Sequence, residues 1–289
     1  MTAPERQPDA TGFALRDPYP WGEFVGLVRA GETAGYRVLF LPEVGTRDTL
    51  AALMGLAGET DRLLLGTGVV PLPARSPGLL AMAAATVQER SGGRLLLGLG
   101  TGPSVPGALA RLRSTVEALR RAFAGVADLP LPLPPQIWIA ALGPKATTLA
   151  GEIADGVILN WCTPARVATA VAQVEAGAEA AGRDPRAVTI AVYVRAALAP
   201  GAADGARLAA AEYASYPSYR RQFADLGIDP ADPDAVVRAV MLTDASSAAE
   251  RLATYRTAGA HLPVVYPVLP LGPPSADAVR ETLGVLAPN

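Results

Sequence analysis

The chain has 289 residues, half of them hydrophobic, with a formal net charge of −2 and a single cysteine. The length allows a large buried core, and the near-neutral charge favours neither a nucleic-acid nor an anionic-membrane partner. A single cysteine excludes an internal disulfide, and the apolar runs are too short for a membrane span. Since residues 1–10 lack the pattern of a signal peptide, we expect a cytoplasmic protein.

Strand and helix patterns alternate eight times along the chain. Short apolar runs next to glycine are typical of strands buried on both faces, and prolines mark several helix starts. The pattern predicts strands at residues 11–17, 36–42, 62–70, 94–101, 136–141, 155–160, 187–198 and 261–269. It predicts helices at residues 20–34, 47–60, 77–91, 107–124, 144–154 and 163–181, one longer helical region up to 258, and a last helix at 275–286.

Eight strand–helix pairs without a break in composition predict one α/β domain over residues 1–289, a (β/α)8 TIM barrel. The alternative is a doubly wound open sheet, which usually has fewer strands. In a barrel, the carboxyl ends of the strands line the active site and the amino ends serve stability. His261 and Arg94 begin their strands, so we expect structural roles for them. The strand-end residues are Glu43, Gly68, Val69, Thr101, Gly102, Ala141, Asn160, Trp161 and Tyr266.

Two neighbouring strands end in glycine-rich turns. Residues 66–70 read GTGVV and residues 93–102 read GRLLLGLGTG. Glycine at a strand end allows a flat ring or a phosphate to approach the backbone. Each turn alone is an ordinary βα connection, but two in adjacent units favour a cofactor cleft. Gly143-Pro144-Lys145 then opens a helix directly after the next strand, where unpaired N–H groups favour a phosphate or carboxylate.

Several common sites have no candidate motif. The chain has no Rossmann fingerprint, no HExxH or CxxC pair and no serine elbow. Dinucleotide, metal and acyl-transfer sites are therefore not predicted. Cys162 follows a strand without a basic neighbour to activate it, which favours a small buried thiol.

Three segments together resemble the luciferase-like flavin and deazaflavin oxidoreductases. They are LGTGVVPLPARSP, SGGRLLLGLGTG and PQIWIAALGPKATTLAGEIADGVI, and the resemblance runs from about residue 35 to 160. It implies the (β/α)8 barrel already counted, and a homodimer. It also implies either the deazaflavin coenzyme F420 for hydride transfer or reduced FMN for monooxygenation.

The resemblance assigns cofactor contacts to the strand ends. It implies a non-prolyl cis peptide between Gly68 and Val69, against the middle ring of the cofactor. Thr101 and Gly102 would contact the phosphate tail or the ring edge. Leu142, Gly143 and Pro144, following Ala141, would hold the tail phosphate, and Asn160 and Trp161 would close that side.

Three departures from the family pattern bear on the reaction. Val44 stands where relatives often have a histidine, Pro103 replaces a glutamate of the sugar-phosphate dehydrogenases, and the long insertion of the monooxygenases after the fourth strand is missing. An open cleft protects an oxygenated flavin poorly, since such species require exclusion of water. We therefore expect an F420-dependent reductase of a C=C or C=N bond in a small carboxylate-bearing substrate of secondary metabolism. An FMN-dependent monooxygenase and a catalytically silent flavin-binding relative remain as alternatives.

A reductase also requires a proton donor and a group that orients the substrate. Glu43 and Tyr266 are the candidate donors, and Arg16 and Arg75 are the candidate partners of a substrate carboxylate. Three side chains have two interpretations each. Arg75 either binds substrate or forms a loop-to-helix salt bridge, Tyr266 points into the barrel mouth or the core, and Trp161 lines the cleft or packs against the helix at 163–181.

Overall fold

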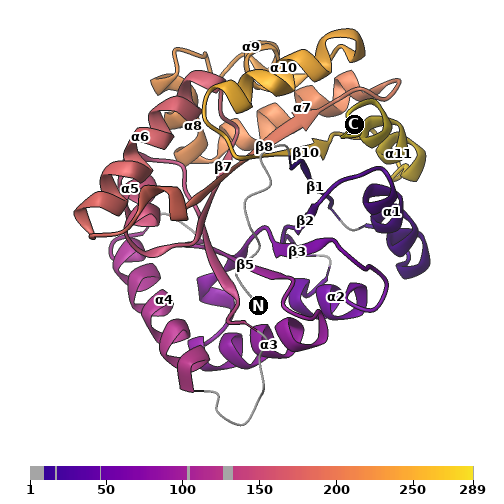
Figure 1. Ribbon diagram of the computed structural model, residues 1–289. Coiled ribbons are helices and arrows are strands. Elements are labelled where there is room, and N and C mark those ends of the chain that lie inside the picture. Colours follow the sequence, from indigo (N-terminus) through magenta and orange to yellow (C-terminus); the bar gives the residue numbers. More distant parts are fainter. Residues whose placement is uncertain (1–9, 17, 46, 103–104, 126–132, 289) are drawn as a thin grey trace.

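Eight parallel strands form a closed ring in the computed structural model, which describes residues 10–16, 18–45, 47–102, 105–125 and 133–288. Figure 1 shows the strands in the middle and the helices around them. The ring closes where Val264 of the last strand pairs with Tyr193. The predicted (β/α)8 barrel is confirmed, and the open sheet is excluded. The order around the ring is β10 (Leu262–Pro267), β1 (Gly12–Ala14), β2 (Val38–Leu41), β3 (Leu64–Thr67), β5 (Leu95–Gly100), β6 (Gln136–Ala140), β7 (Gly156–Asn160) and β8 (Thr189–Ala196).

Helices cover the outer face of the ring. Several begin at a proline, whose missing N–H has no partner in a first turn, or at a side-chain cap. Ser76, for example, accepts a hydrogen bond from the N–H of Leu79, and Thr163 accepts one from Arg166. These helices are α1 (Trp21–Thr33), α2 (Thr49–Leu56), α3 (Pro77–Arg90), α4 (Ala108–Gly125), α5 (Pro144–Ile153), α6 (Pro164–Ala180) and α11 (Ala276–Val285).

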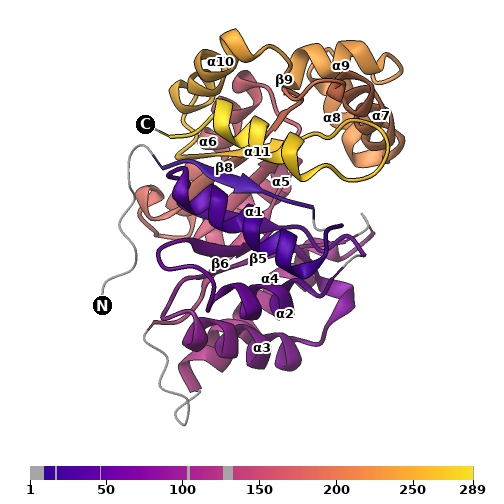
Figure 2. The same cartoon turned by 90° about the vertical axis from the view of Figure 1, so that its right-hand side faces the viewer.

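The long helical region expected after β8 is several separate elements. Pro217 and Pro233 each begin a new helix, because proline cannot continue the preceding one. The elements are α7 (Ala202–Ser215), α8 (Pro217–Asp225), α9 (Pro233–Val240), β9 (Met241–Leu242), which pairs with β8, and α10 (Ala245–Thr257). Figure 2 shows α7, α8 and α9 gathered on one side of the barrel.

The predicted third strand is interrupted near its end. β3 stops at Thr67, and a two-residue strand β4 (Val70–Pro71) resumes the pairing with β5. Between them lies the Gly68–Val69 peptide bond, which is cis as predicted. Short 3-10 turns, η1 (Leu72–Ala74) and η2 (Pro185–Ala187), follow β4 and α6.

Two glycines of β5, Gly98 and Gly100, leave room for the segment from β3 to β4 to lie close to β5. A Cβ on Gly98 would lie 2.1 Å from the carbonyl oxygen of Thr67, and one on Gly100 would lie 2.6 Å from Val69 Cγ2. Thr67 Oγ1 donates to the Gly98 oxygen (2.7 Å) and accepts from the Gly98 N–H (2.8 Å). These two glycines therefore serve packing between strands, whereas we expected the glycines of this stretch to allow a cofactor to approach.

Aromatic side chains fill part of the barrel interior. Phe40 of β2 contacts Trp138 of β6 and Tyr193 of β8, with ring centroids 5.7 and 5.9 Å apart. Tyr193 in turn packs edge-on against Tyr266 of β10 at 5.7 Å. Tilted aromatic contacts of this kind add to the free energy gained from burying the rings. The aromatic cluster thus links four strands across the barrel.

The amino ends of the strands carry structural hydrogen bonds. His261 Nδ1 accepts from the N–H of Ile190 at 2.9 Å, in line with the structural role expected for this histidine. Arg94 donates to the carbonyl oxygens of Ala57, Thr60 and Leu63. These contacts are in line with the expectation that this end of the barrel serves stability.

No helix in the described part of the chain combines the length and the apolar character needed to cross a membrane. Within the same residues, no three His, Cys, Asp or Glu side chains gather in a manner that would hold a metal ion. Val44 is exposed, and Pro103 lies outside the described residues.

Candidate functional site

The strand register brings the predicted cofactor-binding residues to one end of the barrel. β3 and β4 both pair with β5, β5 pairs with β6, β6 with β7 and β7 with β8, all parallel. The carboxyl ends of these strands therefore meet at the same mouth. The residues at or directly after these ends include Gly68, Val69, Thr101, Ala141 and Asn160.

The turn before α5 offers unpaired backbone donors. Gly143 caps the helix without a side chain, and a Cβ built on it would meet no atom within 4 Å. Leu142 is half-buried, whereas Gly143 and Pro144 are exposed. Pro144 has no N–H, and the N–H of Ala146 donates to the Gly143 oxygen at 3.1 Å. The N–H groups of Gly143 and Lys145 make no hydrogen bond to a described residue, so these two donors are open to an anionic group.

Arg166 of α6 fixes that turn from behind. It is 9% exposed, and its Nη2 donates to the carbonyl oxygen of Leu142 at 2.7 Å and to Thr147 Oγ1 at 3.3 Å. Sequence reasoning missed Arg166 because its contacts come from the neighbouring helix. The arginine holds the loop conformation in which the Gly143 backbone stays open.

Four further predicted cofactor contacts, Thr101, Gly102, Gly68 and Val69, are partly or fully exposed. Thr101 is half-buried, and its hydroxyl donates to the neighbouring Gly102 oxygen at 3.2 Å. Gly102 has a φ of +70°, and Gly68 and Val69 are half-buried at the mouth. Hydroxyl and N–H donors without a carboxylate suit a flat group with a phosphate tail. The residues present therefore fit such a cofactor.

Glu43 and Arg75, expected in different roles, form an ion pair. Arg75 Nη1 lies 2.5 Å from Glu43 Oε1, and Nη2 lies 2.5 Å from Asp48 Oδ2. Arg75 and Glu43 are 11% and 13% exposed. The hydrogen bond to Glu43 raises the pKa of Arg75 above its ordinary value. The loop-to-helix salt bridge is thus the observed state, and Arg75 is not free to hold a substrate carboxylate.

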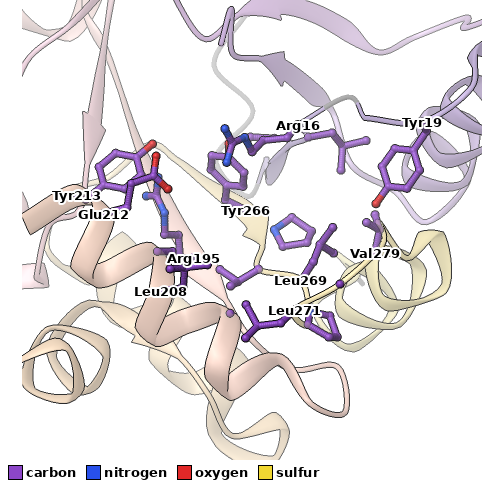
Figure 3. A pocket seen from close by; sticks show the side chains of 18 residues that line it. Arg16, Tyr19, Arg195, Leu208, Glu212, Tyr213, Tyr266, Leu269, Leu271 and Val279 are labelled. Atoms are coloured by element: carbon purple, nitrogen blue, oxygen red, sulfur yellow. The ribbon is translucent and has the colours of Figure 1, made fainter. Parts of the chain in front are cut away.

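Tyr266 lines a cavity of about 320 Å³ at the ends of β1, β8 and β10. Figure 3 shows its neighbours there, with Arg16, Arg195 and Glu212 around Tyr266. The tyrosine is only 8% exposed, and it belongs to the barrel interior as well as to the cavity wall. Burial raises the pKa of Tyr266 to about 12, although the charge of Arg195 opposes that shift. The phenol is therefore protonated at neutral pH.

Asn160 is held by two side chains that the sequence did not single out. Its Oδ1 accepts from Arg195 Nη1 at 2.5 Å, and its Nδ2 donates to Tyr219 Oη at 2.8 Å. Arg195 is the one charged residue of the predicted strand at 187–198, and this was the signal that could have revealed it. Tyr219 gives no comparable signal, because it lies on α8, 59 residues further along the chain.

Trp161 is covered by the α7–α8 helices. Its ring is 1% exposed and lies 4.7 Å from Tyr213 and 5.7 Å from Phe223. The sequence left two positions open, a wall of the cleft or packing against the helix after β7. The buried ring forms no open wall of the mouth, and it packs against α7 and α8. Cys162 next to it is buried, and burial raises the pKa of its thiol to about 12, in line with an inert buried thiol.

A closed parallel barrel with an interrupted third strand and open donors at the strand ends defines a (β/α)8 enzyme-type scaffold. Residues 3–262 match the luciferase-like monooxygenase family, and the chain belongs to this family. The resemblance seen in the strand-end motifs is thereby confirmed.

Curated relatives share shorter segments. A 5,10-methylenetetrahydromethanopterin reductase of Methanolobus tindarius is 34% identical over 176 residues, which are 51% of this chain and 52% of the relative. The F420-dependent hydroxymycolic acid dehydrogenase of Mycobacterium tuberculosis is 34% identical over 46% of this chain and 44% of its own length. The matched segment thus spans about half the length of these relatives.

Solved structures resemble the chain over almost its whole length. The F420-dependent tetrahydromethanopterin reductase of Methanopyrus kandleri has a TM-score of 0.81 at 20% identity and covers 97% of this chain and 98% of its own. The monooxygenase RslO1 of Streptomyces bottropensis has a TM-score of 0.73 at 22% identity, with 96% and 97% covered. At these identities the likeness establishes the fold alone.

Proposed function

We propose that this protein is an F420-dependent oxidoreductase, which reduces a C=C or C=N bond of a small carboxylate-bearing substrate. The observation that carries the proposal is the donor set at the mouth of β3 to β7, in a chain whose matched relatives include F420-dependent enzymes by name. When bound, the reduced deazaflavin supplies a hydride. A cytoplasmic homodimer and a place in secondary metabolism belong to the same proposal.

The cofactor would lie on backbone and hydroxyl groups. In this arrangement the Gly143 turn holds a phosphate of the tail, supported by Arg166 through the Leu142 carbonyl. Thr101 would donate to the tail or to the edge of the ring, and the Gly68–Val69 segment would support the ring. Pre-positioned donors of this kind orient a cofactor without reorganisation during the reaction.

Tyr266 is the better of the two candidate proton donors. Glu43 Oε1 accepts from Arg75 and Oε2 accepts from the N–H of Thr49 at 3.3 Å, so both oxygens already act as acceptors in the fold. Tyr266 keeps its proton at neutral pH and lines the cavity. A neighbouring cation, Arg195, with its guanidinium carbon 4.8 Å from the ring centroid, would stabilise the phenolate left after proton transfer.

Two variants of Gly143 test the phosphate seat. Gly143→Asn and Gly143→Asp have nearly the same shape, and both residues are good helix caps, so both proteins should fold. The aspartate adds a negative charge where the phosphate is expected. We expect F420 to bind Gly143→Asp about tenfold more weakly than Gly143→Asn in fluorescence titrations. Equal affinities would contradict the placement.

The choice of cofactor is tested by titrating the protein with F420 and FMN side by side. Preferential F420 binding, followed by anaerobic oxidation of F420H2 with a panel of enones and imines, supports the reductase. Oxygen consumption with reduced FMN would favour the monooxygenase instead. Tight F420 binding without turnover on any substrate would favour a catalytically silent relative.

A further inference from the structure

We propose that the cavity at the ends of β1, β8 and β10 is a subsite for small organic acids, in which Arg195 binds the carboxylate and leucines contact the apolar body. The cavity is the substrate site only if the proposed function holds, but acid binding itself requires no cofactor. Arg195 is thus assigned as the residue that binds the substrate carboxylate, whereas the sequence favoured Arg16 and Arg75 for this role.

Arg195 is a buried cation without a carboxylate partner among the described residues. It is 4% exposed, and the one hydrogen bond that its side chain makes to a described residue goes to Asn160 Oδ1 at 2.5 Å. A guanidinium carries five N–H donors in a planar fork, so most of its donors remain available. Because a buried charge without a counter-ion is costly, an anionic ligand at this position would be favoured.

Three aromatic rings hold the guanidinium in place. Its carbon lies 4.1 Å from the ring centroid of Trp161, 4.7 Å from that of Tyr213 and 4.8 Å from that of Tyr266. These cation–π contacts offset part of the cost of burying the charge, and they limit the rotamers of the arginine. The side chain is therefore pre-organised for a planar, bidentate partner such as a carboxylate.

The charges around the cavity favour an anion. Among the described residues, the charged ones that line it are Arg195, Arg16 and Glu212, whose formal charges sum to +1. Arg16 is exposed, and its side chain forms no hydrogen bond or ion pair with the residues that the structure describes, so it can approach the same anion. Figure 3 shows both arginines and Glu212 around Tyr266.

The rest of the lining is apolar and partly open to solvent. Leu208 of α7 and Leu271 after β10 are 59% and 58% exposed and both line the cavity, together with Leu269 and Val279. Its volume, about 320 Å³, is at the lower end of the range for small-ligand pockets. The lining therefore suits a small acid with a hydrocarbon or aromatic body.

The position of the cavity complements the cofactor seat. The strands β8, β10 and β1 form one arc of the ring, and β3 to β7 form the arc across the mouth. Asn160, at the end of β7, bonds to Arg195 and so joins the two arcs. An acid anchored on Arg195 would have Tyr266 beside it and would face the proposed cofactor across the mouth.

Matched pairs of acids and amides test the subsite. Benzoate against benzamide, and 3-phenylpropanoate against 3-phenylpropanamide, differ only in the charged group. Binding is measured by calorimetry and by ligand-observed NMR, with and without F420. We expect the acid of at least one pair to bind with an affinity at least about tenfold higher than that of its amide, because hydrogen bonds between two charged groups are stronger than those to a neutral group. Binding should also change the tryptophan fluorescence, since Trp161 stacks on Arg195.

Three variants identify the group responsible. Arg195→Gln should abolish the preference for the acid, and Arg16→Gln, at an exposed position, should weaken it without unfolding risk. Arg186→Gln is the control, because its side chain is 89% exposed on η2 at the other end of the barrel. If folded Arg195→Gln keeps the preference, or if no acid is preferred over its amide, the proposal is wrong.

The outcome can be separated from that of the proposed function. Acid binding that depends on Arg195 in a protein without affinity for F420 would support the subsite and refute the cofactor assignment. Affinity for F420 without a preference for acids would support the cofactor assignment and refute the subsite. An Arg195→Gln variant that loses only F420 affinity would show that the arginine merely positions Asn160, and this too would overturn the subsite.

Discussion

Arg75 and Glu43 lie 2.5 Å apart in a half-buried ion pair at the barrel mouth, with Asp48 bound to the other side of the guanidinium. The loop after β4 is thereby tied to the segment between β2 and α2. Two residues with plausible separate roles in chemistry instead hold two loops of the mouth together. The pair consequently shapes the entrance to the site without being free to act on a ligand.

Replacement of Arg75 should therefore cost stability. We expect Arg75→Gln to lower the free energy of unfolding by about 1–3 kcal/mol, because hydrogen bonds to charged groups are lost and Glu43 is left without its partner. Urea denaturation measures the loss. Asp48→Asn is the control, since Asp48 is 52% exposed and an exposed pair contributes about 1 kcal/mol or less. An unchanged stability with a raised KM would instead assign Arg75 to substrate binding.

Gly68 is restricted by the hydroxyl of Tyr193. A Cβ at Gly68 would lie 2.0 Å from Tyr193 Oη but 3.3 Å from its Cζ. We expect Gly68→Ala to destabilise the protein by about 1–3 kcal/mol, as overpacking does, and Tyr193→Phe to recover part of that loss in the double variant. A double-mutant cycle by thermal or urea unfolding measures the coupling. Additive effects would show that the hydroxyl is not the obstacle.

Arg94 should be essential for stability and irrelevant to ligands. It donates five hydrogen bonds, to Ser91, Ala57, Leu63 and twice to Thr60. A lysine cannot reproduce this planar set of donors, so Arg94→Lys should lower the free energy of unfolding by about 2–3 kcal/mol. F420 affinity should not change, since Arg94 lies at the amino end of β5. Arg62→Lys, an exposed neighbour, is the control and should be neutral.

Cys162 should react only when the protein unfolds. Burial raises the pKa of its thiol to about 12, and the side chain is 2% exposed. At pH 8 the native thiol should resist iodoacetamide, while the urea-unfolded chain is alkylated; mass spectrometry counts the adducts. The raised pKa also implies a stability contribution that is complete below the unfolded value of about 8.5 and is lost as the pH rises toward 12. Rapid alkylation of the native protein would contradict the buried placement.

The arrangement of strands and helices could be predicted because its signals are local. Apolar runs bounded by glycine and prolines at helix starts occur in short segments, and the eight repeats leave few topologies that bury all strands on both faces. The resemblance of the GTGVV segment to its family located the cis bond at Gly68–Val69. The prediction of one long helical region after β8 was wrong, because it did not treat Pro217 and Pro233 as helix starts and did not identify the two-residue strand β9.

The roles of individual side chains depended on partners distant in the chain. Arg75 and Glu43 are 32 residues apart in the sequence, and Arg195 and Asn160 are 35 residues apart, so no local pattern predicts either pair. Local patterns and the family resemblance together were sufficient to predict the barrel fold and to predict which end of the barrel carries the candidate site. Whether each charged group there is free or already paired is settled by long-range contacts, because a hydrogen bond depends on the distance between two atoms in the folded chain.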